Sequence, residues 1–252
     1  MDTALGPEDL QLAIDSVVGK FLERLRLFRP PVDWIEVAGA LPGLAWQPDD
    51  HAAGITRKKA AARGMVMLGD GLADEQNQRI AAQAIAHTLM PELLKQMGAQ
   101  TGEKAPSAWT RLVVGRLMVP PAWFQTLWRE SGGEFPRVLQ GFGSTPLELL
   151  AARLVEGSEP AVVTVIDHGV ATQRVSNGPR VGRGLLDLEK ECLEYVNRFS
   201  RARQMSSGAM TVWGWPIHRA DWKKELLRTL FVEDSGTDIS RGKQDRQWEQ
   251  DD

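Results

Sequence analysis

The sequence Asn77-Gln78-Arg79-Ile80-Ala81-Ala82-Gln83-Ala84-Ile85-Ala86-His87 is the stretch that best indicates the fold of the N-terminal part of this chain. Alanine and straight-chain residues favour a helix, and the spacing predicts one over residues 73–89. Pro91 is expected to end or kink this helix, because proline cannot donate the helical hydrogen bond. A short apolar run at residues 65–68 predicts a strand just before it. Gln83 and His87 are therefore expected one turn apart on the same helix face.

This spacing matches that of a zinc-binding helix in which one metal ligand and the general base have been replaced. In an HExxH motif, two His at i and i+4 bind one metal ion, and the adjacent Glu deprotonates the metal-bound water. The corresponding residues here are Gln83, Ala84, Ile85, Ala86 and His87. An amide stands at the first ligand position and is a poor zinc donor, while Ala84 occupies the position of the general base. We therefore expect no catalytic residue and no bound metal, with His87 as the only candidate ligand.

The segments around this helix resemble the ImmA/IrrE family of metallo-endopeptidases. The helix is similar to the family's RQRFTLAHELGH segment, and Leu117-Met118-Val119-Pro120 resembles the family's LLMP. Residues 142–154 resemble its FGVSxEAxxxRL segment, so the resemblance covers residues 30–156. Where the family's second helix carries an acidic third ligand, this chain has Trp109. The resemblance implies a zincin-like fold with a vestigial metal site at Gln83, His87 and Trp109.

The family cuts helix-turn-helix repressors and so switches on genes of mobile elements or stress responses. Without the ligands and the base, the resemblance implies a pseudopeptidase, a regulatory protein that binds a protein partner such as a repressor, with no cofactor. One alternative is an active zinc endopeptidase with a rearranged metal site. Another is a sensor whose C-terminal domain, rich in Trp213, Trp215 and Trp222, binds a ligand or partner.

The character of the sequence changes at Gly157-Ser158-Glu159-Pro160. Residues 1–156 are expected to form the metallopeptidase-like domain, residues 157–234 a small α+β domain, and residues 235–252 a disordered tail. Within the second domain the pattern predicts strands at 161–167 and 170–176 joined by a turn at His168-Gly169, a helix at 185–199, a strand at 210–215 and a short helix at 221–231. The predicted fold class is α+β, with a mainly helical zincin-like N-terminal domain that carries a small sheet.

Composition narrows the function classes. The chain has 252 residues, a formal net charge of -3 and 42% hydrophobic residues, so it carries no overall basic footprint for nucleic acid. A basic cluster at Arg57, Lys58, Lys59 and Arg63 is a candidate contact for phosphate or an acidic partner, with a solvated loop as the alternative. The single cysteine, Cys192, excludes an internal disulfide and fits a cytoplasmic protein. No apolar run is long enough to predict a membrane span.

Overall fold

A computed structural model describes residues 6–48, 65–68, 74–99, 105–178, 182, 184–218 and 222–231. Its helices are α1 (Pro7–Arg24), α2 (Trp34–Gly39), α4 (Asp74–Gln96), α5 (Ser107–Met118), α6 (Pro121–Glu130), α7 (Phe135–Phe142), α8 (Leu147–Arg153) and α9 (Asp187–Phe199). Its strands are β1 (Ala45–Pro48), β2 (Met65–Leu68), β3 (Ala161–Asp167), β4 (Val170–Ser176), β5 (Arg203–Ser207), β6 (Met210–Pro216) and β7 (Lys224–Phe231). The predicted α+β class is confirmed, and none of the described helices combines the length and apolar character needed to cross a bilayer.

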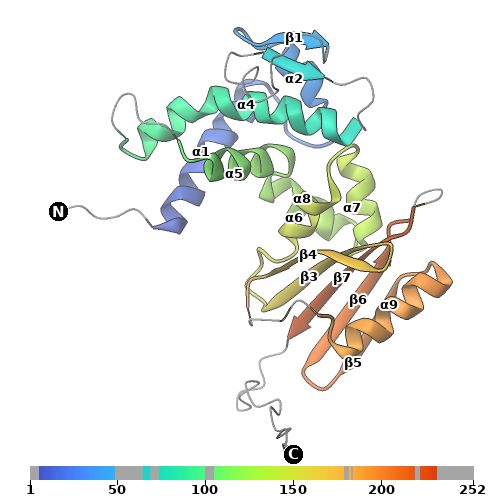
Figure 1. Ribbon diagram of the computed structural model, residues 1–252. Helices are drawn as coiled ribbons and strands as arrows, with labels where there is room; N and C mark the ends of the chain where they lie inside the picture. The colour runs from blue at the N-terminus through green and yellow to red at the C-terminus, as the bar shows by residue number, and fades with distance from the viewer. Residues whose placement is uncertain are drawn as a thin grey trace, which may run out of the picture.

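The N-terminal part is organised around α4, which contacts α1, α2, α5 and β2 (Figure 1). The predicted strand at residues 65–68 is present as β2, and it pairs in parallel with β1, which was not predicted. Asp33 caps α2, because its carboxylate accepts the backbone N–H groups of Ile35 and Glu36. The small sheet and α2 therefore lie together on one side of the long helix.

Of the two outcomes expected at Pro91, an end of the helix is wrong, because α4 continues to Gln96. Proline removes the hydrogen bond to the carbonyl of His87, but both residues lie on the exposed side of the helix, where solvent can satisfy that carbonyl. On the opposite side, Met90 and Leu93 are buried in the main core. Burial of this apolar side outweighs the loss of one solvent-facing bond.

Local contacts accompany the ends of other helices. Helix α1 ends at Arg24, and helix α8 begins at Leu147 after Pro146. The hydroxyl of Thr145 donates to the carbonyl of Phe142 and so closes the end of α7.

The C-terminal sheet is antiparallel with the strand order β4-β3-β7-β6-β5. The predicted hairpin is confirmed, and its two turn residues, His168 and Gly169, both have positive φ, at 47° and 79°. The predicted helix at residues 221–231 is wrong, because Lys224–Phe231 is the strand β7 and pairs with both β3 and β6. Strand β5, which was not predicted, forms the far edge of the sheet.

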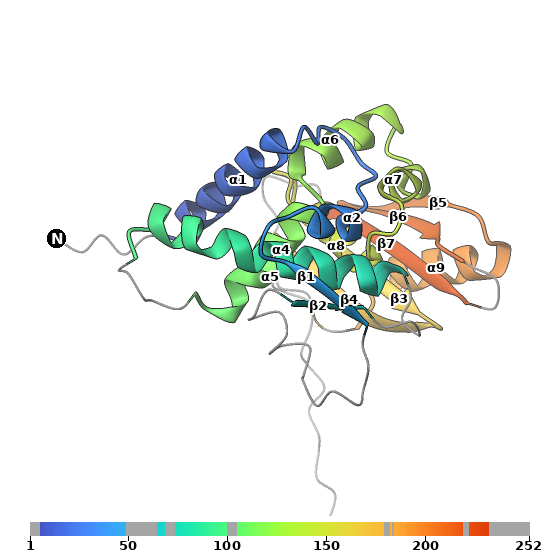
Figure 2. The ribbon, with the colours of Figure 1, turned by 90° about the horizontal axis from the view of Figure 1, so that it is seen from above.

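The two faces of this sheet have different partners. On one face, Val163, Val165, Trp215 and Leu226 belong to the same core as the N-terminal helices. On the other face, α9 covers a second cluster, made of Ile166, Cys192, Val196, Val212 and Leu227. Figures 1 and 2 show α9 on the side of the sheet away from α6, α7 and α8. The sheet is thus a layer between α9 and the N-terminal helices, which explains why residues 161–166 of β3 are all buried.

Candidate functional site

The helix that carries the predicted vestigial site exposes one narrow stripe. Gln76, Arg79, Gln83, His87 and Pro91 are exposed at helical spacing. The positions beside this stripe are buried, namely Gln78, Ala81, Ala82, Ala84, Ile85 and Ala86. Gln83 and His87 therefore share one exposed face, as their spacing predicts, whereas the position of the general base holds a buried methyl group.

His87 stands alone on this stripe. Within the described residues it makes no hydrogen bond or ion pair, and partial desolvation beside the helix lowers the pKa of its imidazole, which favours the neutral ring. A neutral imidazole can bind a metal, but a catalytic zinc site needs about three protein ligands and an activated water. In the part of the chain that the structure describes, no three His, Cys, Asp or Glu side chains lie close enough together to hold a metal ion. The described residues therefore do not fit zinc.

Trp109, at the place of the acidic ligand, is half-buried and packs against the main core. The described residues include no ring contact between Trp109 and His87, and Gln83 is exposed. Of the three residues of the predicted vestigial site, Gln83 and His87 are exposed on one stripe of α4, and Trp109 packs against the main core. The predicted partner contacts Arg57, Lys58, Lys59 and Arg63, and the predicted tail at 235–252, lie outside the described residues.

A buried amide that the sequence analysis did not single out holds α4 against α2. The side-chain oxygen of Gln78 accepts the backbone N–H of Trp34 at 2.7 Å, and its amide nitrogen donates to the Asp33 carboxylate at 3.1 Å. Partial burial alone would raise the pKa of Asp33, but the Gln78 amide and two backbone N–H groups together lower it. Stability from this carboxylate is therefore present above its ordinary pKa of 3.8 and is lost as the pH falls through the lower value of the folded state.

Replacing Gln78 with Leu is expected to destabilise the fold by about 1–3 kcal/mol, because the buried N–H of Trp34 loses its acceptor. Urea unfolding at pH 7 measures this cost, with Gln76→Leu on the exposed stripe of the same helix as the matched control. Equal stability of the two variants would show that the hydrogen bonds of Gln78 do not contribute to the free energy of unfolding. The loss should shrink as the pH falls through the lowered pKa of Asp33 in the folded chain, because protonation of Asp33 then weakens the same cluster in the parent chain.

A second candidate site is a cavity of about 420 Å³ between the α6–α7 connection and the sheet. Its lining residues are Trp128, Gly132, Gly133, Glu134, Ala202, Arg203, Gln204, Trp213, Trp215 and Arg228. The strand register places Gln204, Trp213 and Arg228 directly opposite one another across β5, β6 and β7, so their side chains share the face toward α6. The cavity therefore has a floor of one polar, one aromatic and one cationic side chain.

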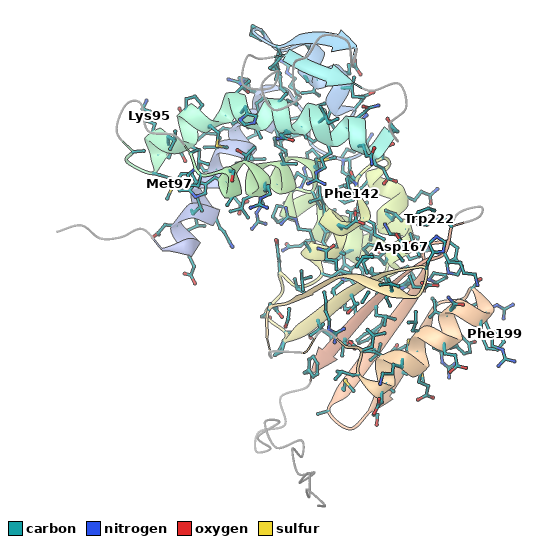
Figure 3. The ribbon with its side chains drawn as sticks, in the orientation of Figure 1. Lys95, Met97, Phe142, Asp167, Phe199 and Trp222 are labelled. Atoms are coloured by element: carbon teal, nitrogen blue, oxygen red, sulfur yellow. The ribbon has the colours of Figure 1, made fainter. Side chains whose placement is uncertain are left out.

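The walls of the cavity are aromatic. Trp128 meets Trp215 edge to face with ring centroids 6.2 Å apart, and the guanidinium of Arg228 lies 5.5 Å from the ring centroid of Trp128. Of the tryptophans singled out in the C-terminal sequence, Trp213 and Trp215 line this cavity. Trp222 does not; it is exposed and packs edge-on against His168 at the end of the sheet near Asp167 (Figure 3).

The two arginines of the lining have different roles. Arg203 lies opposite Gly214, on the face that packs against α9, and its guanidinium lies 4.8 Å from the ring centroid of Tyr195 on that helix. Its charge therefore belongs to the α9 side of the sheet. Arg228 alone among the described lining residues directs a cationic side chain toward Trp128. The sequence gives no signal for this cavity, because its walls come from segments far apart in the chain.

Comparisons with known proteins find a similar fold but identify no family. No family model and no curated protein matches the sequence. Among solved structures, a transcriptional regulator of Mycobacterium tuberculosis is similar, with a TM-score of 0.59 and 13% sequence identity. The match covers 89% of this chain and 76% of that protein. At this identity the likeness concerns the fold, and it extends over both the helical part and the sheet.

Proposed function

We propose that this chain is a regulatory protein with an ImmA/IrrE-like scaffold that binds a protein partner, such as a helix-turn-helix repressor, without cutting it. The observation that carries the proposal is the exposed stripe of α4. It offers an amide at the first ligand position of an HExxH helix, while the base position is a buried methyl group. Peptide hydrolysis by a metallopeptidase depends on metal-activated water and a base, and this stripe supplies neither.

The stripe suits binding. Gln76, Arg79, Gln83 and His87 present hydrogen-bonding side chains from a long helix whose other sides are packed in the core. Such a row can meet the backbone or side chains of a partner at little cost in conformational freedom, because the helix is already held in place. The fold shared with a transcriptional regulator supports a place in gene regulation.

A second candidate function is a ligand sensor, and the cavity between α6 and the sheet favours it. The cavity lies between the N-terminal helices and the C-terminal sheet, so a bound molecule would contact both. The two functions are compatible, because the cavity and the α4 stripe share no residue.

The test incubates the protein, purified without chelator or His tag, with candidate helix-turn-helix repressors. We expect a stable complex, an unchanged repressor mass by mass spectrometry, and zinc and manganese well below one equivalent by elemental analysis. Gln83→Arg should weaken the complex by about tenfold or more, because a bulky charge would stand in the middle of the stripe. Arg111→Glu, at an exposed position of α5, is the matched control and should leave binding unchanged.

The result that contradicts the proposal is near-stoichiometric metal that disappears in His87→Ala, together with repressor fragments. That result would establish the alternative of an active zinc endopeptidase with a rearranged metal site. Binding that is equal for Gln83→Arg and the parent chain would place the partner elsewhere on the surface.

A further inference from the structure

We propose that the cavity between α6 and the sheet binds a small aromatic monoanion, with a flat ring against the tryptophans and a carboxylate on Arg228. The proposal rests on the sensor function given above and adds the chemical class of the ligand. It is carried by the joint presence in one cavity of aromatic walls and a partly buried cation, Arg228, whose carboxylate partner is distant and exposed.

The aromatic walls favour a flat ring. Trp128, Trp213 and Trp215 line the same space, and Trp215 is held by Trp128 on one side and by Phe135, with ring centroids 5.9 Å apart, on the other. Rings fixed in this way offer large apolar faces that lose little freedom when a second ring stacks on them. The volume of about 420 Å³ lies within the range of small-molecule sites and accommodates a ring system with one substituent.

The charge inside the cavity favours an anion. The side chain of Arg228 is only 16% exposed, and its one described carboxylate partner, Glu159, is 3.7 Å away and 67% exposed. Its Nε is buried without a hydrogen-bond partner among the described residues. Burial lowers the pKa of this guanidinium, with the Glu159 charge opposing the shift only in part. A largely desolvated cation with so weak a partner is costly, and a bound anion would compensate it through charge-assisted hydrogen bonds.

The rim limits the charge and shape of the ligand. Gly132 and Gly133 both have positive φ, and this part of the rim carries no side chain, which leaves space beside Trp128. Glu134 follows them, is exposed, and places a negative charge at the opening. A ligand with a second anionic group near the opening would be repelled, so a monoanion fits better. A quaternary ammonium ligand, which aromatic cages otherwise bind, would meet the Arg228 cation.

The test is isothermal titration calorimetry on the full chain with indole-3-acetate and phenylacetate. Indole-3-acetamide serves as the neutral aromatic control and acetate as the non-aromatic anion. We expect both aromatic anions to bind, with each control weaker by about tenfold or more, because one charge-assisted contact or one stacked ring would be missing. Arg228→Gln should reduce the affinity for the anions by about tenfold, whereas Arg198→Gln, at an exposed position of α9 outside the cavity, should leave it within about twofold.

The proposal is overturned if the neutral amide binds as tightly as the acid, if Arg228→Gln binds like the parent chain, or if neither aromatic anion binds. The selectivity of the unmodified chain keeps the test decisive even where Arg228→Gln does not fold, which circular dichroism would reveal. A negative result here leaves repressor binding untouched, because that experiment probes the α4 stripe and its own variant.

Discussion

Replacing Glu189 with Gln is expected to destabilise the fold by about 3–5 kcal/mol. The Glu189 carboxylate is fully buried at the start of α9 and accepts hydrogen bonds from Arg174 at 3.2 and 2.9 Å and from the Thr229 hydroxyl at 2.6 Å. It also accepts the backbone N–H of Leu186 at 2.8 Å. One carboxylate therefore joins α9 to β4 and β7. Gln keeps the shape but leaves the guanidinium of Arg174, which is 9% exposed, as an unpaired buried charge.

Chemical denaturation followed by far-UV circular dichroism measures this loss. Glu191→Gln, at an exposed position of the same helix, is the matched control and is expected to change stability by less than about 0.5 kcal/mol. A double variant, Glu189→Leu with Arg174→Met, should recover much of the loss, because apolar residues of similar volume remove both buried charges together. A Glu189→Gln protein as stable as the control would mean that Arg174 finds another partner.

Replacing Trp215 with Ala is expected to cost about 3–5 kcal/mol, the range for deleting a large buried aromatic side chain. Trp215 is 3% exposed, and it contacts Trp128 of α6 and Phe135 of α7 from its place on β6. Its loss would leave a void between the sheet and the N-terminal helices, where Phe142 also lies (Figure 3). The same change should abolish ligand binding in the cavity, because a wall is removed.

The melting temperature by differential scanning calorimetry measures the effect of Trp215→Ala. Trp222→Ala is the matched control, since Trp222 is 49% exposed and lies outside the main core. Near-equal melting temperatures for the two variants would contradict the packing described for β6 against α6 and α7.

The sequence predicted the helices that have a clear apolar face and the hairpin that has a clear turn. Helix α9 begins two residues later than predicted and ends at the predicted residue, and the strands on either side of His168-Gly169 have their predicted bounds. Strand β7 was missed because Lys224, Glu225 and Leu226 are residues that favour helices in isolation. Pairing with β3 on one side and β6 on the other outweighs that local preference.

For the candidate sites too, the sequence predicted only what residues close together in the chain determine. The spacing of Gln83 and His87 fixes their common face, so the exposed stripe of α4 could be predicted locally. The cavity could not, because Trp128, Gln204 and Arg228 are brought together only by the packing of α6 on the sheet. The buried partners of Glu189 likewise lie on other strands, and nothing in the sequence near Glu189 distinguishes it from the exposed Glu191.

The core shared by the N-terminal helices and the sheet has a consequence for dissecting this protein. The change in sequence character near Gly157 invites separate expression of two halves. A cut there would strip Val163, Val165, Trp215 and Leu226 of their cover and give the C-terminal half an open apolar face. Such a face promotes aggregation. If an isolated half then bound no partner or ligand, the result would reflect its low solubility rather than the absence of a binding site. Point substitutions in the intact chain are the sound way to assign each activity to its surface.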